Sequence, residues 1–297
     1  VELASSIDPE YLAGAITGAD AALTRGRGRM PRTVLAAGTK LKCVARCGVG
    51  TDNIDLAAAT ELGIPVVFAP GSTTMAVAEH ALMLMLGVAR RIARFDRETK
   101  SGNWAFRNSA GMTTELRGKT LGILGLGDIG RRIGELGQAF GMNIIYWSRN
   151  SNDSRFRFVS KEELYRDSDI ISVSLALNDE TRGLVGRDAF AAMKPGAILI
   201  NTARGEVIDE QELVKALSEG RLAGAGIDVI QDEVHPEQNP LWQLDNVLVT
   251  PHVAAITDVT YRDMCVTTAT EVANILKGTE PTERLIRNPK VILNRRR

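Results

Sequence analysis

Opposite charges balance in this sequence, and neither sign is in excess. The 36 Lys and Arg residues match the 36 Asp and Glu residues, so the formal net charge at pH 7 is zero. A neutral chain has no long-range field that would draw in nucleic acid or an anionic membrane surface. We therefore expect neither as a partner, and any anionic ligand must be held by local groups.

Long apolar runs are scarce as well. The longest covers residues 81–89, which is too short to span a bilayer, and we find no signal-peptide pattern. The chain begins at Val1, and its first residues read like the interior of a domain. We expect a short segment, such as a first strand, to precede Val1. The basic residues 295–297 favour a solvated terminus over a nucleic-acid arm.

Cysteine is nearly absent. Cys43 and Cys47 fall in an apolar strand-like run, and Cys265 falls in a helical pattern. A metal pair or a reactive thiol is the alternative interpretation, but no second Cys/His cluster completes a zinc site. We interpret the three cysteines as buried structural thiols, which predicts a reducing, cytoplasmic setting.

What the chain does have is a regular alternation of β-branched runs and helical stretches. Its 297 residues suggest two domains, and the alternation predicts an α/β fold of parallel sheets with crossover helices. We expect two doubly wound parallel-sheet domains with a cleft between them. Residues 1–95 and 270–297 would form a substrate domain, and residues 96–269 would form a Rossmann-type dinucleotide-binding domain.

Individual elements follow from the same pattern. A long helix at residues 75–99 suits a linker, a subunit contact or a core helix, and a last helix at residues 258–277 would return the chain to the first domain. In the first domain we expect a helix at residues 56–62 and strands at residues 21–24, 41–47 and 65–68. In the second domain we expect six strands, at residues 120–124, 143–147, 170–175, 198–201, 225–228 and 247–250.

A glycine-rich turn directly follows the predicted strand at residues 120–124. It reads Gly125-Leu126-Gly127-Asp128-Ile129-Gly130 and opens a helix. In dinucleotide-binding folds the first glycine permits the tight turn, the second lets backbone approach a pyrophosphate, and the third lets helix and strand pack closely. The helix N-terminus adds free N–H groups and a partial positive charge. A plain structural turn is the alternative, and the flanking strand and helix favour the dinucleotide site.

The choice of cofactor is less clearly marked. The strand at residues 143–147 would normally end in an acidic residue that binds the adenosine ribose, but Ser148 and Arg149 stand there. Because an arginine fork matches phosphate oxygens, these residues favour NADP over NAD. If Arg149 is only a solvated loop residue, NAD is the cofactor.

Three polar residues follow predicted strands, at the edge where open α/β sheets bind ligands. Arg204 follows the strand at residues 198–201, Glu233 lies in the loop after Asp228, and His252 follows the last strand. Hydride transfer to a carbonyl carbon leaves negative charge on the oxygen, and a histidine can supply the proton near neutral pH. Glu233 would favour the protonated imidazolium, and Arg204 would grip a substrate carboxylate.

Each of these residues also has a structural interpretation. Arg204 could form an inter-domain ion pair, and Glu233 could be a solvated member of an acidic loop. The chain has only three histidines. We expect His80, in the long helix, to be structural, and His235, in a proline-flanked loop, to be the rival acid. His252 is preferred because it ends a strand.

These segments resemble those of the D-isomer-specific 2-hydroxyacid dehydrogenases, which include phosphoglycerate, glyoxylate/hydroxypyruvate and D-lactate dehydrogenases. The resemblance covers nearly the whole chain and rests on residues 46–55, 125–130, 201–205, 224–233 and 250–252. It implies a two-lobed enzyme, usually a homodimer, that moves a hydride between NAD(P)H and C2 of a small 2-oxo or D-2-hydroxy acid.

The resemblance also implies a substrate site. His252 would be the acid and base, Glu233 its partner, and Arg204 the substrate anchor. Backbone at Val49 and Gly50 would bind the substrate carboxylate.

The cofactor contacts that the resemblance implies lie along the second domain. Asp128 and Ile129 would contact the pyrophosphate. The nicotinamide half would lie along Leu175, Thr202 and Asp228, with Asp228 near its carboxamide.

The chain departs from the family pattern in two places, and two rival functions stay open. Glu233 lacks the proline that usually follows it, and residues 175–178 replace a segment that usually carries Pro and Thr. One rival is a dinucleotide-binding corepressor-like protein of the same fold. The other is an enzyme that oxidises formate or phosphite.

Overall fold

The computed structural model describes residues 1–26 and 28–295, so residues 296 and 297 of the basic tail lie outside the described part. The chain divides into two compact units, Val1–Thr73 with Thr257–Arg297, and Thr74–Ile256. Within the described residues, no helix combines the length and the apolarity that a bilayer crossing needs.

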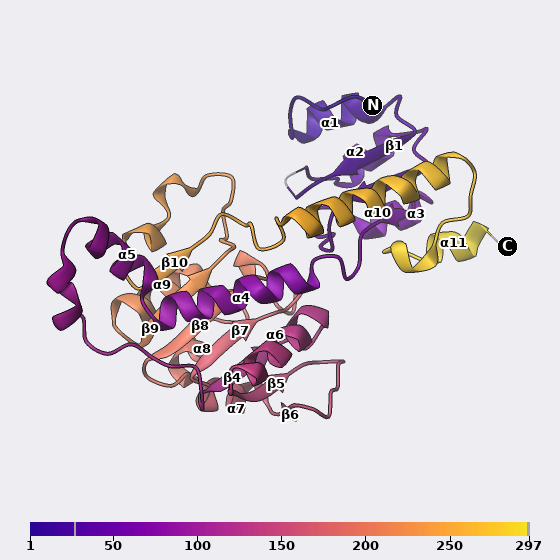
Figure 1. Ribbon diagram of the computed structural model, residues 1–297. Helices are drawn as coiled ribbons and strands as arrows, with labels where there is room; N and C mark the ends of the chain where they lie inside the picture. The colour runs from indigo at the N-terminus through magenta and orange to yellow at the C-terminus, as the bar shows by residue number, and fades with distance from the viewer. Residues whose placement is uncertain (27, 296–297) are drawn as a thin grey trace. The chain divides into compact units, whose positions relative to one another are not determined.

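The first unit is built on a three-stranded parallel sheet in the order β1-β2-β3. Figure 1 labels its first strand, β1. Its strands are β1 (Ala21–Thr24), β2 (Cys43–Arg46) and β3 (Val66–Val67). Successive side chains of β2 point to opposite faces: Val44 belongs to one buried cluster, and Cys43 and Ala45 belong to another. The strands predicted at residues 41–47 and 65–68 are present but shorter, as β2 and β3.

Helices cover both faces of this sheet, so the unit is doubly wound, as predicted. The cluster around Val44 takes its side chains from α1 (Pro9–Ile16), α2 (Arg32–Ala37) and α3 (Leu56–Glu61). The cluster around Cys43 takes its side chains from α10 (Asp258–Leu276) and α11 (Lys290–Arg295), and from the segment that follows η5 (Glu283–Leu285).

The second unit has a seven-stranded sheet in the order β10-β9-β8-β7-β4-β5-β6, and every neighbouring pair is parallel. The strands are β4 (Thr120–Leu124), β5 (Asn143–Trp147), β6 (Arg157–Phe158), β7 (Ile170–Val173), β8 (Ala197–Asn201), β9 (Leu222–Ile227) and β10 (Val247–Val249). The strand order reverses between β4 and β7, which is the switch point where Rossmann-type sheets bind a dinucleotide. Six of these strands match the prediction, and β6 is an addition.

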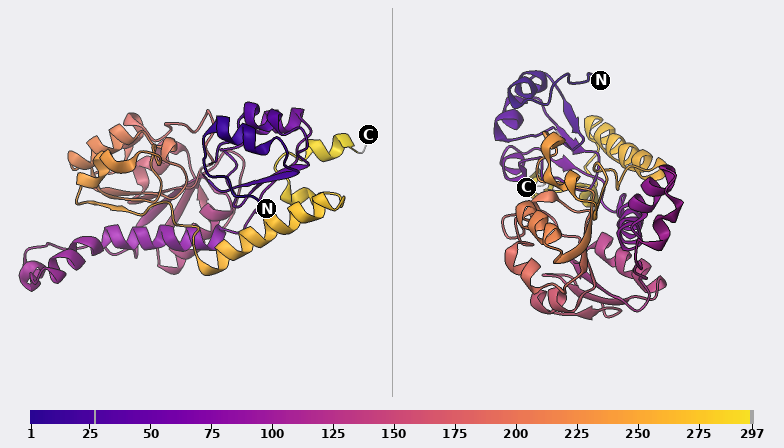
Figure 2. Two further views of the ribbon diagram at one scale, coloured as in Figure 1. Left: turned by 90° about the horizontal axis from the view of Figure 1, so that it is seen from above. Right: turned by 90° about the vertical axis from the view of Figure 1, so that its left-hand side faces the viewer.

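Helices also cover both faces of the larger sheet. One buried cluster lies under α4 (Thr74–Ala89) and α6 (Asp128–Ala139). The other lies under α7 (Lys161–Asp167), α8 (Arg187–Ala192) and α9 (Glu210–Ser218). The left view of Figure 2 shows α4 below this sheet and the orange helices above it. Short 3-10 turns complete the unit: η1 (Trp104–Asn108), η2 (Gly205–Val207), η3 (Pro236–Gln238) and η4 (Pro240–Gln243).

The single long helix predicted at residues 75–99 is wrong, because the structure has two helices there. α4 ends at Ala89, and α5 (Ile92–Lys100) begins after Arg91, whose φ of 50° is left-handed. The Arg91 guanidinium donates to the carbonyl oxygens of Ala110 and, at 2.9 Å, Met112. The segment around Ala110 and Met112 therefore binds Arg91 just after the end of α4, and this contact could not be predicted from the local sequence.

The border between the units also differs from the predicted one. α4 belongs to the second unit, because glycines of β9 let it approach the sheet closely. A Cβ at Gly226 would lie 2.8 Å from Leu84 Cβ, and a Cβ at Gly224 would lie 2.7 Å from Val88 Cγ1. Residues 257–269 belong to the first unit because they begin with the N-cap and first turns of α10.

Candidate active site

The glycine-rich turn follows β4 at the switch point, and packing requires two of its glycines. Gly125 has a φ of +103°, and a Cβ there would lie 2.7 Å from the carbonyl oxygen of Ser174. A Cβ at Gly130 would lie 2.2 Å from the Gly125 carbonyl oxygen. These two glycines are explained by the fold alone.

Gly127 is different, because a Cβ there would meet nothing within 4 Å. Its φ of −81° and ψ of −165° are open to any residue. Gly127 is the N-cap of α6, and it has no side chain that could accept hydrogen bonds from the N–H groups of the first helical turn. That turn begins with Asp128 and Ile129. Open space before an uncapped helix N-terminus is what a pyrophosphate needs. The residues present therefore fit a dinucleotide, and the evidence for this is the open space at Gly127.

Ser148 and Arg149 follow β5 as predicted, but each already has a partner. Ser148 Oγ accepts a hydrogen bond from the Ser151 N–H at 3.3 Å. The Arg149 guanidinium forms an ion pair with the carboxylate of Glu180, in the loop after β7. A 2′-phosphate at this position would have to compete with that carboxylate.

The residues expected beside the nicotinamide lie at the ends of three neighbouring strands. Leu175 lies two residues after β7, Thr202 directly follows β8, and Asp228 directly follows β9. The Asp228 N–H donates to the Asn201 carbonyl oxygen at 2.9 Å. The sheet therefore presents all three along its carboxyl edge.

Glu233 and His252 come together, although they lie in loops after different strands. His252 Nδ1 lies 2.8 Å from Glu233 Oε1 and 2.9 Å from Oε2. Both side chains are partly open to solvent, with exposed fractions of 41% and 33%. The contact uses Nδ1, so Nε2 is the ring nitrogen that faces away from the carboxylate. This pair has the geometry of a general acid and its orienting carboxylate.

The rival histidine, His235, has a different environment. Its Nδ1 lies 3.3 Å from Asp232, and its side chain is 77% exposed. Backbone N–H groups of His235 and Val234 hold the pKa of Asp232 below its usual range. The Asp232 carboxylate therefore accepts its hydrogen bonds from its own loop, and His235 lies on the surface.

The backbone around Arg204 is fixed by its neighbours. The Asn201 side chain donates to the Arg204 carbonyl oxygen at 2.9 Å and accepts from the Ala203 N–H at 3.0 Å. A Cβ at Gly205 would lie 2.0 Å from the carbonyl carbon of Ile230. The arginine loop thus packs against the chain that leads to Glu233. In the sequence, Asn201 and Gly205 stand out only as parts of a motif, so these positioning contacts could not be predicted from it.

Val49 and Gly50 follow β2 in the first unit, at the turn where Gly48 has a φ of +139°. The Gly48 carbonyl oxygen accepts a hydrogen bond from the Ala69 N–H at 2.9 Å. Because these residues belong to the other compact unit, their role in binding the substrate carboxylate stays a prediction.

Sequence reasoning also missed a network around His80, which it treated as structural. His80 Nε2 lies 2.8 Å from Thr250 Oγ1 and 3.4 Å from Asp228 Oδ1. A polar residue on the buried part of an apolar helix was the available signal, but its partners lie far away in the sequence.

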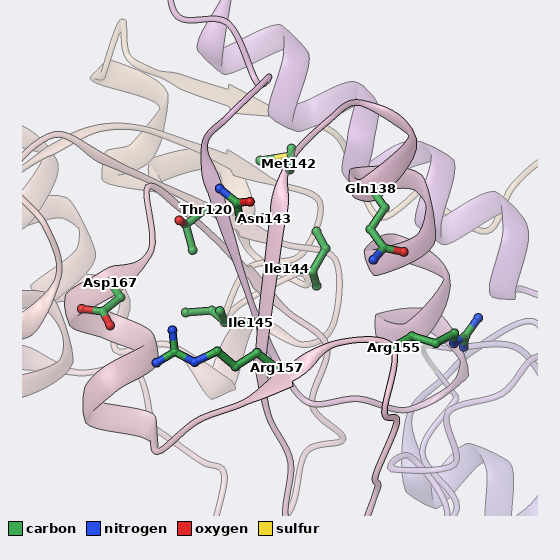
Figure 3. Close-up of a pocket in the computed structure, with 9 residues that line it drawn as sticks. All are labelled: Thr120, Gln138, Met142, Asn143, Ile144, Ile145, Arg155, Arg157 and Asp167. Atoms are coloured by element: carbon green, nitrogen blue, oxygen red, sulfur yellow. The ribbon is translucent and has the colours of Figure 1, made fainter.

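A cavity of about 570 Å³ lies at the opposite edge of the larger sheet. Its lining includes Thr120 and Asn143, which begin β4 and β5. Figure 3 shows the Arg155 and Arg157 side chains there pointing in opposite directions. Both arginines form ion pairs with carboxylates of their own unit. We therefore place the candidate site at the carboxyl edge and not in this cavity.

The cysteines form no metal site within the described residues, where no group of three or more possible ligands occurs. None of the three forms a disulfide bond within the described residues. Cys43 and Cys47 are buried, as predicted, and Cys265 is only partly buried.

A protein-family model matches residues 82–254 of the chain. The model describes the D-isomer specific 2-hydroxyacid dehydrogenase, NAD binding domain. The chain belongs to the D-isomer-specific 2-hydroxyacid dehydrogenase family. The family and the fold class predicted from the sequence are thereby confirmed.

Relatives of known name agree with this membership. The chain is 38% identical to a D-3-phosphoglycerate dehydrogenase of Archaeoglobus fulgidus, over 94% of the chain and 53% of the relative. It is 42% identical to a glyoxylate reductase of Aeropyrum pernix, over 89% of the chain and 82% of the relative. The chain thus spans about half the length of the phosphoglycerate dehydrogenase.

A solved structure shows the same fold. The D-lactate dehydrogenase from Aquifex aeolicus, complexed with NAD and lactic acid, superimposes with a TM-score of 0.87 at 28% identity. The match covers 93% of this chain and 89% of that one.

Proposed function

We propose that this chain is a nicotinamide-dinucleotide-dependent oxidoreductase that interconverts a small 2-oxo acid and the corresponding D-2-hydroxy acid. The observation that carries the proposal is the contact between Glu233 and His252, at the sheet edge that also holds the open position at Gly127. The names of the relatives support glyoxylate, hydroxypyruvate or a phosphorylated analogue as the substrate class.

The residues of this edge divide the chemistry between them. A bound nicotinamide supplies or accepts the hydride. His252 Nε2 donates a proton to the substrate oxygen during reduction and removes it during oxidation. Glu233 accepts the hydrogen bond from Nδ1, which fixes the orientation of the imidazole ring. Arg204 binds the substrate carboxylate through its guanidinium fork.

For the cofactor we propose NADP, with Ser148 and Arg149 as the binders of the 2′-phosphate. The support is the absence of an acidic residue directly after β5. Binding requires Arg149 to leave Glu180, whereas NAD binding does not.

We also propose a homodimer in which α5 and η1 contact a second copy of the chain. No residue of α5 or η1 is buried, and even the large apolar side chains of Ile92 and Trp104 are 55% and 66% exposed. The rings of Phe95 and Phe106 pack edge to face, with centroids 5.6 Å apart, so this exposed apolar segment is ordered by its own contacts. Exposed large apolar side chains such as Ile92 and Trp104 suit an interface with a second copy of the chain. The three cysteines form no disulfide bond within the described residues, which is consistent with the proposed cytoplasmic setting.

The test is an absorbance assay at the NAD(P)H band with both cofactors. The panel is glyoxylate, hydroxypyruvate and phosphohydroxypyruvate, and formate or phosphite with oxidised cofactor as rivals. Loss of the proton donor in His252→Ala should lower kcat by about a hundredfold or more, and His235→Ala should keep wild-type turnover.

Three results would contradict the proposal. Unchanged turnover in His252→Ala would remove that residue from the reaction. Turnover only with formate or phosphite would favour that rival enzyme. Cofactor binding without turnover on any compound would favour a corepressor-like protein.

A further inference from the structure

The turn that carries His252 is held by one buried residue, Asp228, whose exposed fraction is 2%. The Asp228 carbonyl oxygen accepts a hydrogen bond from the His252 N–H at 2.8 Å. The Asp228 carboxylate accepts from the N–H groups of Val253 and Ala254, each at 3.0 Å. Three successive backbone N–H groups therefore end on the same residue.

Two more side chains complete the surroundings of this carboxylate. Thr250 Oγ1 lies 2.5 Å from Asp228 Oδ1. An ionised carboxylate only accepts hydrogen bonds, so the Thr250 hydroxyl must be the donor in this contact. Its proton is then committed, and the 2.8 Å contact with His80 Nε2 must be a hydrogen bond donated by the imidazole. The contacts thus run in one direction, from His80 through Thr250 to Asp228.

The charge of Asp228 is compatible with this direction. Burial alone would raise its pKa, but the contacts with His80, Thr250, Val253 and Ala254 together hold the pKa below its usual range. The carboxylate is therefore ionised at neutral pH. A buried charge is tolerated only when it is fully hydrogen-bonded. Loss of one donor therefore destabilises the buried carboxylate and the hydrogen bonds that remain to it.

The turn needs such support, because His252 has a φ of 55°. A residue with a Cβ persists in this region only where the surroundings hold it there. We propose that His80, Thr250 and Asp228 are positioning residues that hold the His252 turn in this conformation and so keep the imidazole against Glu233. The inference rests on the proposed function, in which His252 is the acid.

A matched pair of variants at Thr250 tests the inference. Thr250→Val keeps the shape of the side chain and removes the hydroxyl, and Thr250→Ser keeps the hydroxyl. The first measurement is amide hydrogen exchange at Val253 and Ala254 by NMR. Because a hydrogen bond to a charged group is lost, exchange in Thr250→Val should be about tenfold faster or more. Thr250→Ser should exchange at the wild-type rate.

The second measurement is steady-state kinetics in light and heavy water. In Thr250→Val we expect kcat to fall about tenfold with little change in KM for the cofactor, because the proton donor is displaced and the nucleotide turn is not. The solvent isotope effect on kcat should rise, since proton transfer becomes slower than the other steps. Thr250→Ser should restore both values. His80→Leu and His80→Gln form a second pair, since glutamine can still donate to the hydroxyl.

The outcomes separate this inference from the proposed function. Wild-type exchange rates in Thr250→Val and His80→Leu would overturn it, and so would faster exchange with unchanged kcat and solvent isotope effect. If the wild-type chain reduces no 2-oxo acid, the proposed function fails, and the exchange rates still decide whether the network holds the turn.

Discussion

Gly127→Ala is the substitution that best separates a cofactor-binding turn from a structural one. The added methyl group meets no protein atom within 4 Å, and the φ of −81° is allowed for alanine. Because alanine restricts the unfolded chain more than glycine does, stability should stay level or rise by about 0.4–1 kcal/mol. For a chain of this size the melting temperature should therefore rise by at most about 3 °C.

Dinucleotide binding should respond in the opposite way. The methyl group of Gly127→Ala stands in the open space before α6, where backbone N–H groups would meet the pyrophosphate. Loss of one hydrogen bond to a charged group costs about 1.5–3 kcal/mol, which raises the dissociation constant of the cofactor by about tenfold to a hundredfold. The prediction is a stable protein with poor cofactor affinity.

The assay combines thermal unfolding with titration of NADH and NADPH, followed by cofactor fluorescence. Gly130→Ala is the matched control, since its Cβ would lie 2.2 Å from a carbonyl oxygen and should lower the melting temperature even without cofactor. Unchanged cofactor affinity in Gly127→Ala would refute the reasoning, because the turn would then be structural. A large loss of stability in that variant would show that the space is not open.

Three further predictions each concern one side chain. Glu180→Gln should release Arg149 and lower KM for NADPH several-fold, with little change for NADH, in initial-rate measurements. Burial raises the pKa of Tyr165 to about 12, and its hydroxyl has no hydrogen-bond partner within the described residues; Tyr165→Phe should therefore leave the melting temperature unchanged or raise it by a few degrees. The pKa of Asp228 is held below its usual range, so the stability its charge contributes is complete at neutral pH and is lost as the pH falls below about 4. Asp228→Asn should be less stable at pH 7 and should lose less between pH 7 and pH 3, as measured by urea midpoints.

Local pattern was enough to predict the core of the second unit. β4 and β5 match their predicted bounds, because each is a short apolar run next to a glycine or a loop. β6 was missed, since two residues carry no period. The break between α4 and α5 was missed for another reason: the contacts that end α4 come from residues 110–114, which reach it only in the folded chain.

The candidate site shows the same division. The contact between Glu233 and His252 could be predicted because each follows a strand, and parallel strands end at one edge of their sheet. Their role in the reaction stays a prediction. The network of His80 could not be predicted, because its direction depends on a hydroxyl and a carboxylate brought close by the packing of α4 on β9. The ion pair of Arg149 was missed as well, since Glu180 lies in a loop after a different strand.

The left-handed backbone at His252 sets stability against activity at a single position. Glycine or asparagine would relax the main chain there, so mutants selected only for heat resistance should drift toward these residues and lose the imidazole. Under the proposed function, histidine at this position combines a strained main chain with the imidazole that turnover requires.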